Sequence, residues 1–362
     1  MRQSAYKDIL DFLQQVVPGT ARGQMRRRFC LMATLIQACM RNGHCRLESL
    51  SEPTDAYRTR KKSSLLQQAK RWLGNKWTDW QTFYLPFAQH FLQGLGARGQ
   101  IVFVIDGSQT GSANTTLMLS VLCRGFAIPV AWVVKKGEKG HFPEEMHTDL
   151  LKLVAPICPT NCCLVLLGDG EFDGLGLQQW CTDNHWMFVV RTSSDRLIDF
   201  GGELARFDSI QTTRPICFIE GALPLANAVY WHDKRHTKPL FLLTNLELGY
   251  EACQFYKRRF KIETLFKHLK SAGFYLHKTR LKCPEKLANL IIVVAFSFVL
   301  SFCIGLFIKQ NESLQNLEVI VRKDRLSKIT PIAIAQLAIN KRCECVLIFF
   351  SDLSKNFNEV FT

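Results

Sequence analysis

YKRRFKIETLFKHLK, residues 256–270, is the segment from which the architecture of this chain can be worked out. At about 100° per residue, an α-helix would bring Tyr256, Arg259, Glu263 and Lys270 within roughly 60° of one another. One stripe of the predicted helix therefore carries a phenol, a guanidinium, a carboxylate and an ammonium. A carboxylate among so many Lys and Arg residues is typical of an acid that binds metal where phosphate is also bound.

The other two faces of this predicted helix differ in character. An apolar stripe consists of Phe255, Ile262, Phe266 and Leu269. A solvated stripe consists of Lys257, Lys261 and His268. A helix of this kind packs one face on a core and exposes another, so the four polar residues would lie along the edge between them.

The spacing Tyr-x2-Arg-x3-Glu-x6-Lys resembles the YREK signature of bacterial insertion-sequence DDE transposases, of the insertion-sequence-four type. The resemblance covers roughly residues 95–300 and implies an RNase H-like catalytic core. It also implies that Glu263 is the third carboxylate of a two-metal site, with two Asp residues upstream, each at the end of a strand. The segments that fit are IVFVIDGS, residues 101–108, and CLVLLGDGEF, residues 163–172.

Asp106 closes the predicted strand Ile101–Ile105, and Asp169 closes the predicted strand Leu164–Leu167. An Asp in such a place is fixed by its strand, and the Gly that follows lets a substrate approach. Two-metal phosphoryl transfer uses about three carboxylates around two hard cations ~4 Å apart. We therefore predict that Asp106, Asp169 and Glu263 are catalytic and bind two Mg²⁺ or Mn²⁺ ions, although each Asp taken singly would be a turn or cap residue.

Two further acids follow Asp169 closely. If the strand ends later than predicted, Asp173 would compete with Asp169 as a ligand. Glu171 is expected to point away from the site, or to support it indirectly by orienting a ligand.

The resemblance also implies DNA contacts for the remaining signature residues. Tyr256 and Arg259 match positions that contact DNA phosphate near the cleaved end, and Lys270 matches a position on the transposon-end backbone. Arg is suited to bidentate phosphate binding, and Tyr to one hydrogen bond plus stacking. Some family members hold a flipped base with a Trp in a β insertion, and Trp231 is the candidate here. The alternatives are a solvated basic helix face for the first three and an ordinary core or surface aromatic for Trp231.

The composition supports a folded protein with a polyanionic partner. The chain has 362 residues, of which 47% are hydrophobic, and its net charge is +15. Such a charge indicates a nucleic acid or an anionic membrane as partner. The 14 cysteines lack zinc-ligand spacing and are those of a reduced, cytoplasmic protein, and the N-terminus does not resemble a signal peptide. We expect a bacterial cytoplasmic location, associated with the nucleoid.

One apolar segment argues for a membrane protein instead. Leu290–Ile308 holds no charged residue and is flanked by Lys286 and Lys309, so its length suits a transmembrane helix. The alternative is a fully buried helix packed on a sheet. We favour the buried helix, because a membrane span here would separate Glu263 from the strands that carry the two Asp residues.

The order of predicted elements gives an α/β fold, namely an RNase H-like mixed sheet with flanking helices, a β-rich insertion and an N-terminal helical domain. The core strands are Ile101–Ile105, Thr116–Cys123, Ala127–Val134, Leu164–Leu167 and Met187–Arg191, with helices near Glu144–Val154 and Leu175–Thr182. The insertion, at about residues 195–245, has strands at Ile216–Ile219, Val229–His232 and Leu240–Thr244.

Three regions follow from this order: residues 1–95, residues 96–310 with the catalytic core, and residues 311–362, a helical segment that is a candidate for dimerisation. Helices are predicted at Tyr6–Val17 and Arg28–Met40, and the pattern continues over Leu65–Phe91. Basic clusters lie at Arg22, Arg26, Arg27 and Arg28, and at Arg58, Arg60, Lys61, Lys62, Lys70 and Arg71. The resemblance implies that this N-terminal domain binds transposon-end DNA, while solvated helix faces are the alternative.

The resemblance implies a cut-and-paste DNA transposase that hydrolyses a phosphodiester at each transposon end and joins the released 3′-OH to target DNA. It also implies a homodimer on double-stranded DNA. Two alternatives are a catalytically silent DNA-binding relative and an RNase H-like nuclease without strand transfer. A single-span basic membrane protein is the third.

Overall fold

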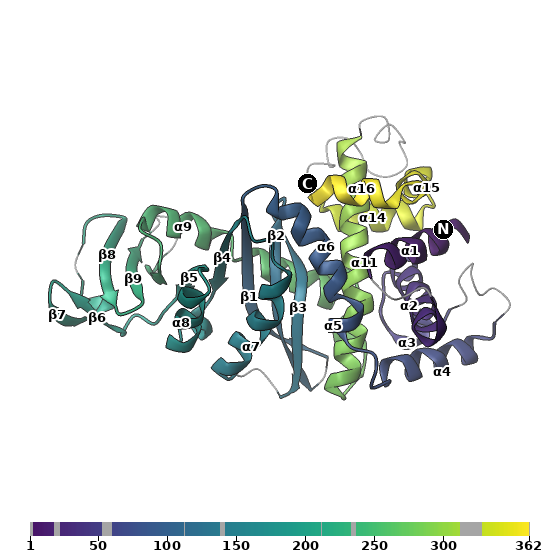
Figure 1. The fold of residues 1–362 in the computed structure, drawn as a ribbon, viewed down its shortest axis with the longest axis horizontal. Coiled ribbons are helices and arrows are strands. Elements are labelled where there is room, and N and C mark those ends of the chain that lie inside the picture. The colour runs from purple at the N-terminus through teal and green to yellow at the C-terminus, as the bar shows by residue number, and fades with distance from the viewer. Residues whose placement is uncertain are drawn as a thin grey trace.

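The computed structural model describes residues 3–17, 22–52, 60–111, 113–137, 142–210, 212–232, 237–311 and 328–361. At its centre is an eight-stranded mixed sheet in the order β3-β2-β1-β4-β5-β10-β9-β8 (Figure 1). Its strands are β1 (Gln100–Thr110), β2 (Asn114–Cys123), β3 (Phe126–Lys136), β4 (Cys163–Gly168), β5 (Met187–Arg191), β8 (Ile216–Leu223), β9 (Ala226–Trp231) and β10 (Leu240–Thr244). A separate hairpin consists of β6 (Leu197–Phe200) and β7 (Glu203–Arg206).

The first five strands have the RNase H-like arrangement that the sequence predicts. β1, β2 and β3 form an antiparallel meander, and β4 and β5 then add parallel to β1 on its other side. Every residue of β2 is buried, which explains why its sequence is nearly continuously apolar or small instead of alternating.

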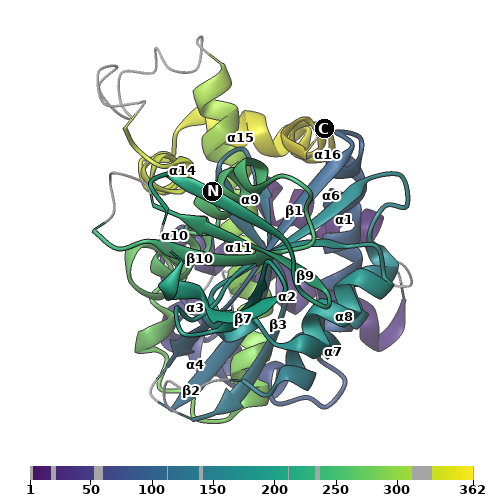
Figure 2. The same cartoon turned by 90° about the vertical axis from the view of Figure 1, so that its left-hand side faces the viewer.

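The β-rich insertion extends this sheet. β10 pairs antiparallel with β5, β9 with β10, and β8 with β9, so the inserted strands continue one hydrogen-bonded sheet beyond the core. Figure 2 views the molecule from this end, with the insertion nearest the viewer. The three strands predicted for the insertion are confirmed, although β9 begins three residues earlier and β8 ends four residues later than expected.

The helices are α1 (Gln3–Val16), α2 (Gly23–Asn42), α3 (Leu47–Leu50), α4 (Lys62–Leu73), α5 (Trp80–Phe83), α6 (Leu85–Gly96), α7 (Glu144–Val154), α8 (Leu175–Asp183), α9 (Gly249–Lys257), α10 (Lys261–Lys267), α11 (Pro284–Gln310), α14 (Pro331–Asn340), α15 (Glu344–Ser351) and α16 (Leu353–Phe361). The helical pattern over Leu65–Phe91 is divided among α4, α5 and α6. Gly74 ends α4, and the Asp79 side chain caps α5 by accepting a hydrogen bond from the Thr82 backbone N–H at 2.7 Å.

The apolar segment predicted as a core helix is α11, the central helix of the molecule. It contacts β3 on one side and the N-terminal and C-terminal helices on the other (Figure 1). Within its most apolar 18-residue window, 94% of the residues are buried by protein, although the helix is long enough to cross a membrane. A helix that is apolar all round is buried all round, and α11 satisfies this inside the fold.

The N-terminal and C-terminal helices share one core. α1, α2 and α4 pack together with α14, α15 and α16 around α11. Phe357 of α16, for example, lies between Phe12 of α1 and Phe87 of α6, at ring-centroid distances of 5.0 and 5.4 Å. The described part of the C-terminal segment is helical as expected, while the domain boundaries and the dimerisation role stay predictions.

Candidate active site

Asp106 and Asp169 lie side by side where β1 and β4 part. The prediction that Asp106 closes its strand is wrong, since β1 continues to Thr110 in its pairing with β2. The parallel pairing of β1 with β4, however, ends at the pair Val104–Leu167, and each Asp comes two residues after it. Side chains two residues apart on a strand share a face, so both carboxylates project from the same face of neighbouring strands.

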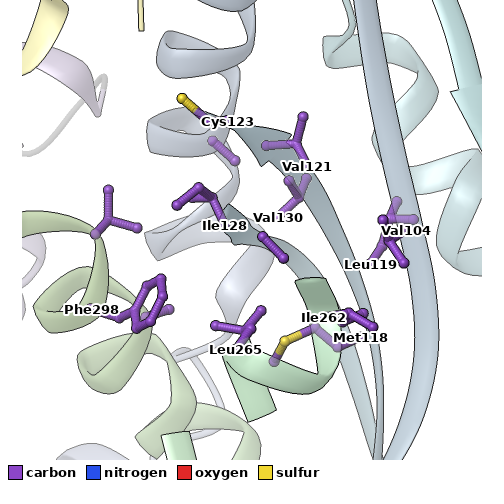
Figure 3. Close-up of a cluster of buried hydrophobic side chains, with 14 of the residues drawn as sticks. Val104, Met118, Leu119, Val121, Cys123, Ile128, Val130, Ile262, Leu265 and Phe298 are labelled. Atoms are coloured by element: carbon purple, nitrogen blue, oxygen red, sulfur yellow. The ribbon is translucent and has the colours of Figure 1, made fainter. Parts of the chain in front are cut away.

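The packing of α10 brings Glu263 to that same face. Ile262 and Leu265 of α10 are part of a buried apolar cluster with Val104 of β1, Met118 of β2 and Val130 of β3 (Figure 3). Val104 shares its face with Asp106, so α10 covers the face that carries the carboxylates. The residue after Ile262 therefore reaches the edge of the cluster near Asp106.

The signature segment is not one regular α-helix, and that expectation is wrong. α9 ends at Lys257, and the backbone N–H groups of Arg258, Arg259, Lys261 and Ile262 each bond to the carbonyl three residues earlier. Such tight bonds change the rotation per residue, so the signature side chains are not spaced at 100°. A π-helical turn, His268–Ala272, then follows α10, and it turns His268 into the core, with its ring 6.2 Å from that of Phe298, instead of leaving it solvated.

Arg259 lies between two of the three carboxylates. Its Nη2 donates to Glu263 Oε1 at 2.8 Å, and its Nη1 lies 3.7 Å from Asp106 Oδ2. The side chains of Arg259 and Asp106 are only 8% and 15% exposed, whereas Glu263 is 54% exposed. The guanidinium also lies over the ring of Phe260, 4.5 Å from its centroid. Arg259 thus neutralises the carboxylates from inside the site.

Burial raises the pKa of Asp106 from an ordinary 3.8 to about 7, and the neighbouring Asp169 adds to this, while Arg259 opposes it. Asp106 Oδ1 accepts a hydrogen bond from the Gly107 backbone at 2.8 Å, and Asp169 Oδ1 accepts one from the Glu171 backbone at 3.0 Å. The site therefore holds more negative charge than its surroundings stabilise. An all-oxygen donor set of this kind suits a hard divalent cation.

These carboxylates do not form a closed metal cage in this conformation. Among the described residues, no group of three or more His, Cys, Asp or Glu side chains is arranged to hold one ion. The guanidinium of Arg259 stands between Asp106 and Glu263, so a cation would have to displace it. The donor chemistry fits a divalent metal, and the predicted two-ion site stays a prediction.

Asp106, Asp169, Glu263, Arg259 and Lys270 all line one cleft of about 790 Å³. The rest of its lining is Gly107, Ser108, Gln109, Thr115, Gly170 and Glu171. Beside Gly170 the space into which a Cβ would project is open, as predicted for a Gly that lets a substrate approach. A Cβ at Gly107 would lie 3.1 Å from the Phe142 ring, so the same prediction does not hold there. Ser108, Gln109 and Thr115 were missed, because β1 was predicted to end before Asp106.

The two acids after Asp169 have other partners. Asp173 accepts hydrogen bonds from Thr192 Oγ1 at 2.5 Å and from Arg196 at 3.1 Å, which removes it as a competitor for Asp169. Glu171 accepts a bond from the Phe142 backbone at 2.6 Å and lies 3.6 Å from a buried imidazole nitrogen of His147. Its side chain lines the cleft and does not point away from the site, and the expected role of orienting a ligand stays a prediction.

The other predicted DNA-contacting residues differ in accessibility. Tyr256 is buried, burial raises the pKa of its phenol, and its ring lies 5.8 Å from the Arg259 guanidinium. Trp231 ends β9, is 5% exposed and lies beneath Lys257, whose Nζ is 5.3 Å from the ring centroid. It is not among the residues that line the cleft, so stacking on a base would first require its ring to be uncovered.

The structure brings the two basic clusters of the N-terminal region together. Arg26, Arg27 and Arg28 of α2 and Arg60 and Arg71 on and before α4 line one cleft of about 760 Å³. Trp72 and Asn75 also contribute to it. Arg58 lies outside the described residues. These parts of the two clusters, 32 to 45 residues apart in sequence, thus form one basic groove, which we name the α2–α4 groove. Arg22, Lys61, Lys62 and Lys70 are not among the residues that line it.

Comparison with known proteins gives one family. The model of the transposase DDE domain matches residues 77–300. Among solved structures, a piggyBac transposase synaptic complex with hairpin DNA is 14% identical, with 98% of this chain and 83% of that chain covered and a TM-score of 0.44. Endonuclease V of Ciona intestinalis, bound to a 24mer DNA containing inosine, is 15% identical, with 59% and 93% covered and a TM-score of 0.28. Human endonuclease V is 15% identical, with 64% and 95% covered and a TM-score of 0.24. No curated protein matches.

Proposed function

The chain belongs to the DDE transposase family, and from this premise we propose that it is an insertion-sequence transposase of the YREK type that cuts and pastes its own element. The observation that carries the proposal is the convergence of Asp106, Asp169 and Glu263 on one cleft, beside a guanidinium and an ammonium. Three carboxylates with adjacent cations suit a substrate that is itself a phosphodiester.

In the proposed reaction, water attacks the phosphorus at the transposon end and the bond to the 3′ oxygen breaks, which releases a 3′-OH. That hydroxyl then loses its proton and attacks the phosphorus of a second phosphodiester. The new P–O bond replaces the one that breaks, and the displaced oxygen takes up a proton and leaves as a hydroxyl. Asp106, Asp169 and Glu263 would hold divalent cations, Mg²⁺ or Mn²⁺, which activate the attacking oxygen and stabilise the leaving one when bound. Asp106 and Asp169 are fixed by their strands, and Glu263 by the packing of α10.

Two side chains of the cleft are suited to hold the DNA strand. Lys270 lines the cleft and can pair with a backbone phosphate. Arg259 neutralises Asp106 and Glu263 in this structure, and cations bound by those carboxylates would free its fork for a bidentate bond to phosphate. Tyr256 would act from behind Arg259 by fixing its position, since the phenol is buried.

The α2–α4 groove is the proposed site for duplex DNA of the transposon end. Its five arginines converge on one open cleft, which is what binding of a phosphate backbone requires. We further propose that the protein acts as a homodimer that holds two ends, in the bacterial cytoplasm where its DNA substrate is found.

The test is cleavage of labelled DNA that carries the element's own ends, in Mg²⁺, by the wild-type protein and by Asp106→Asn, Asp169→Asn and Glu263→Gln. Metal-dependent nicking by the wild type, lost in all three variants while DNA binding is kept, is the expected result. Equal binding without cleavage in all four proteins would indicate a silent DNA-binding relative. Nicking without joined products, when target plasmid is supplied, would indicate a nuclease that lacks strand transfer.

A further inference from the structure

A second basic cleft lies next to the active site, and nothing in the catalytic proposal uses it. It has a volume of about 420 Å³ and lies between α3 with the residues before it and the loop that follows the π-helical turn. It is lined by Arg46, Leu47, Glu48, Ser49, Lys278, Thr279, Arg280 and Leu281. We name it the 46–280 cleft.

The walls of the 46–280 cleft carry several positive charges and one acid. Arg46, Lys278 and Arg280 are exposed, and within the described part of the chain no acidic side chain forms an ion pair with any of them. Burial lowers the pKa of His44, and the nearby Arg46 and Lys278 lower it further. Glu48 is the counter-charge present, and it opposes these effects only weakly.

The loop is held rigidly in place. The Cys45 backbone N–H donates to the Phe274 carbonyl at 2.9 Å, and the His44 ring stacks on Tyr275 with centroids 5.1 Å apart. Lys278 Nζ also lies over the Tyr275 ring, 4.7 Å from its centroid. These contacts position the loop and Lys278 before any ligand arrives, and preorganisation of this kind lowers the entropic cost of binding.

The backbone of this loop is strained at two places. Tyr275 and Arg280, which flank the 3-10 turn Leu276–Lys278, have φ of 56° and 52°, a region that favours glycine. Such a conformation is retained where the surrounding structure imposes it, often at ligand-binding loops. Lys278 and Arg280 both line the cleft.

Two contacts connect the segments that form the 46–280 cleft with those that form the catalytic cleft. The His277 ring contacts the carbonyl of Lys270, which lines the catalytic cleft. On the other side, Asn114 at the start of β2 donates to the Leu281 carbonyl at 3.1 Å, and the next residue, Thr115, lines the catalytic cleft. A polyanion leaving the catalytic cleft past Lys270 therefore meets the cations of the 46–280 cleft next.

We propose that the 46–280 cleft binds the phosphodiester backbone of the DNA strand that extends from the catalytic cleft, through Arg46, Lys278 and Arg280 and without reading bases. The proposal rests on the proposed function, because it takes DNA as the substrate of the adjacent site. The hydroxyl of Ser49, which lines the cleft, supplies a neutral donor to the same phosphates. Backbone contacts of this kind set the position of the cleaved bond relative to the carboxylates.

The test compares two charge-matched double variants of the full-length protein. Lys278→Gln with Arg280→Gln removes two cations from the cleft. Lys7→Gln with Lys355→Gln removes two exposed cations from α1 and α16, outside the cleft, and serves as the control. Binding of labelled transposon-end DNA is measured by fluorescence anisotropy at several salt concentrations, together with Tm and nicking rate.

The cleft variant should bind DNA about tenfold more weakly, with the slope of log K against log salt reduced by about 2, and with an unchanged Tm. Nicking at saturating DNA should keep its rate while the DNA concentration for half-maximal rate rises. DNA with single methylphosphonate linkages should then show a phosphate whose neutralisation weakens the wild type but not the cleft variant.

Equal loss of affinity in both double variants would overturn the proposal, because net charge would then be the cause. If every methylphosphonate position that weakens the wild type weakens the cleft variant equally, the proposal is overturned as well. A wild type that binds DNA but never nicks it would refute the catalytic proposal while leaving this comparison intact. A wild type that binds no DNA would refute both.

Discussion

Arg259→Gln tests whether the guanidinium is the internal counter-cation of the carboxylate site. Arg259 Nη1 lies 3.7 Å from Asp106 Oδ2, and both side chains are nearly buried. At this separation a charge pair is worth roughly 4 kcal/mol at an effective dielectric of about 20. Part of this is offset because the variant no longer buries a guanidinium. Glu263, more than half exposed, adds little. We expect the free energy of unfolding in EDTA at pH 8.5 to fall by about 3 kcal/mol.

The loss should depend on pH in a defined direction. The folded-state pKa of Asp106 is about 7, above its ordinary 3.8, so Asp106 binds a proton in the folded state while it is ionised in the unfolded chain over that interval. The contribution of Asp106 to the free energy of unfolding is therefore greatest below about pH 4, and it is lost as the pH rises to about 7. At pH 5.5 Asp106 is already mostly protonated, so Arg259→Gln should cost only about 1 kcal/mol there.

Urea unfolding at pH 5.5 and 8.5 measures both values. The matched control is Arg258→Gln, one residue away and exposed, which should cost less than about 0.5 kcal/mol at either pH. In the double variant with Asp106→Asn, the effect of Arg259→Gln at pH 8.5 should shrink by about 2 kcal/mol. Equal losses at the two pH values, or equal losses for Arg258→Gln and Arg259→Gln, would refute the reasoning.

Three further predictions concern other parts of the molecule. Asp173→Asn should retain metal-dependent nicking within about threefold but lower the free energy of unfolding by ~1–2 kcal/mol, because its bonds to Thr192 and Arg196 are structural; a loss of nicking like that of Asp169→Asn would contradict this. Gly305→Ala should lower the free energy of unfolding in urea by ~2 kcal/mol or more, because the new Cβ would meet the Pro331 carbonyl oxygen at 1.9 Å. The control is Ser301→Ala on the same helix. It removes a buried hydroxyl without a hydrogen-bond partner and should be nearly neutral. Affinity for transposon-end DNA should fall at least tenfold between ~50 and ~200 mM salt in filter-binding assays, as expected for a phosphate-contacting surface, and a flat salt response would argue against the α2–α4 groove.

Much of the catalytic core could be predicted from the sequence. Its strands are apolar runs of ordinary length, bounded by Gly and polar residues, and their order along the chain is enough to give the sheet. Asp106 and Asp169 were found because each follows such a run, and Glu263 because it belongs to a dense polar pattern. The structure brings all three to one cleft, and their chemical roles stay proposals.

The structural details that could not be predicted from the sequence depend on contacts between distant segments. β1 continues beyond Asp106 because β2 pairs with it there, and a propensity argument about residues 101–108 contains no information about that partner. The 3-10 bonds at Arg258–Ile262 and the π-helical turn at His268 are likewise set by how α9, α10 and α11 fit the sheet. A regular 100° periodicity therefore placed His268 in solvent and left Arg259 free.

The central position of α11 has a consequence for how the protein is made. α2 and α4, the walls of the α2–α4 groove, both pack on α11, whose residues are 284–310. During synthesis the apolar face of α2 therefore stays without its partner until α11 is translated. At ~5–20 residues per second this interval is on the order of tens of seconds. The groove acquires its final shape only after the strands bearing the carboxylates have left the ribosome. A chain interrupted before residue 310 would lack the support of that groove and should compete poorly with the complete protein for the ends of the element.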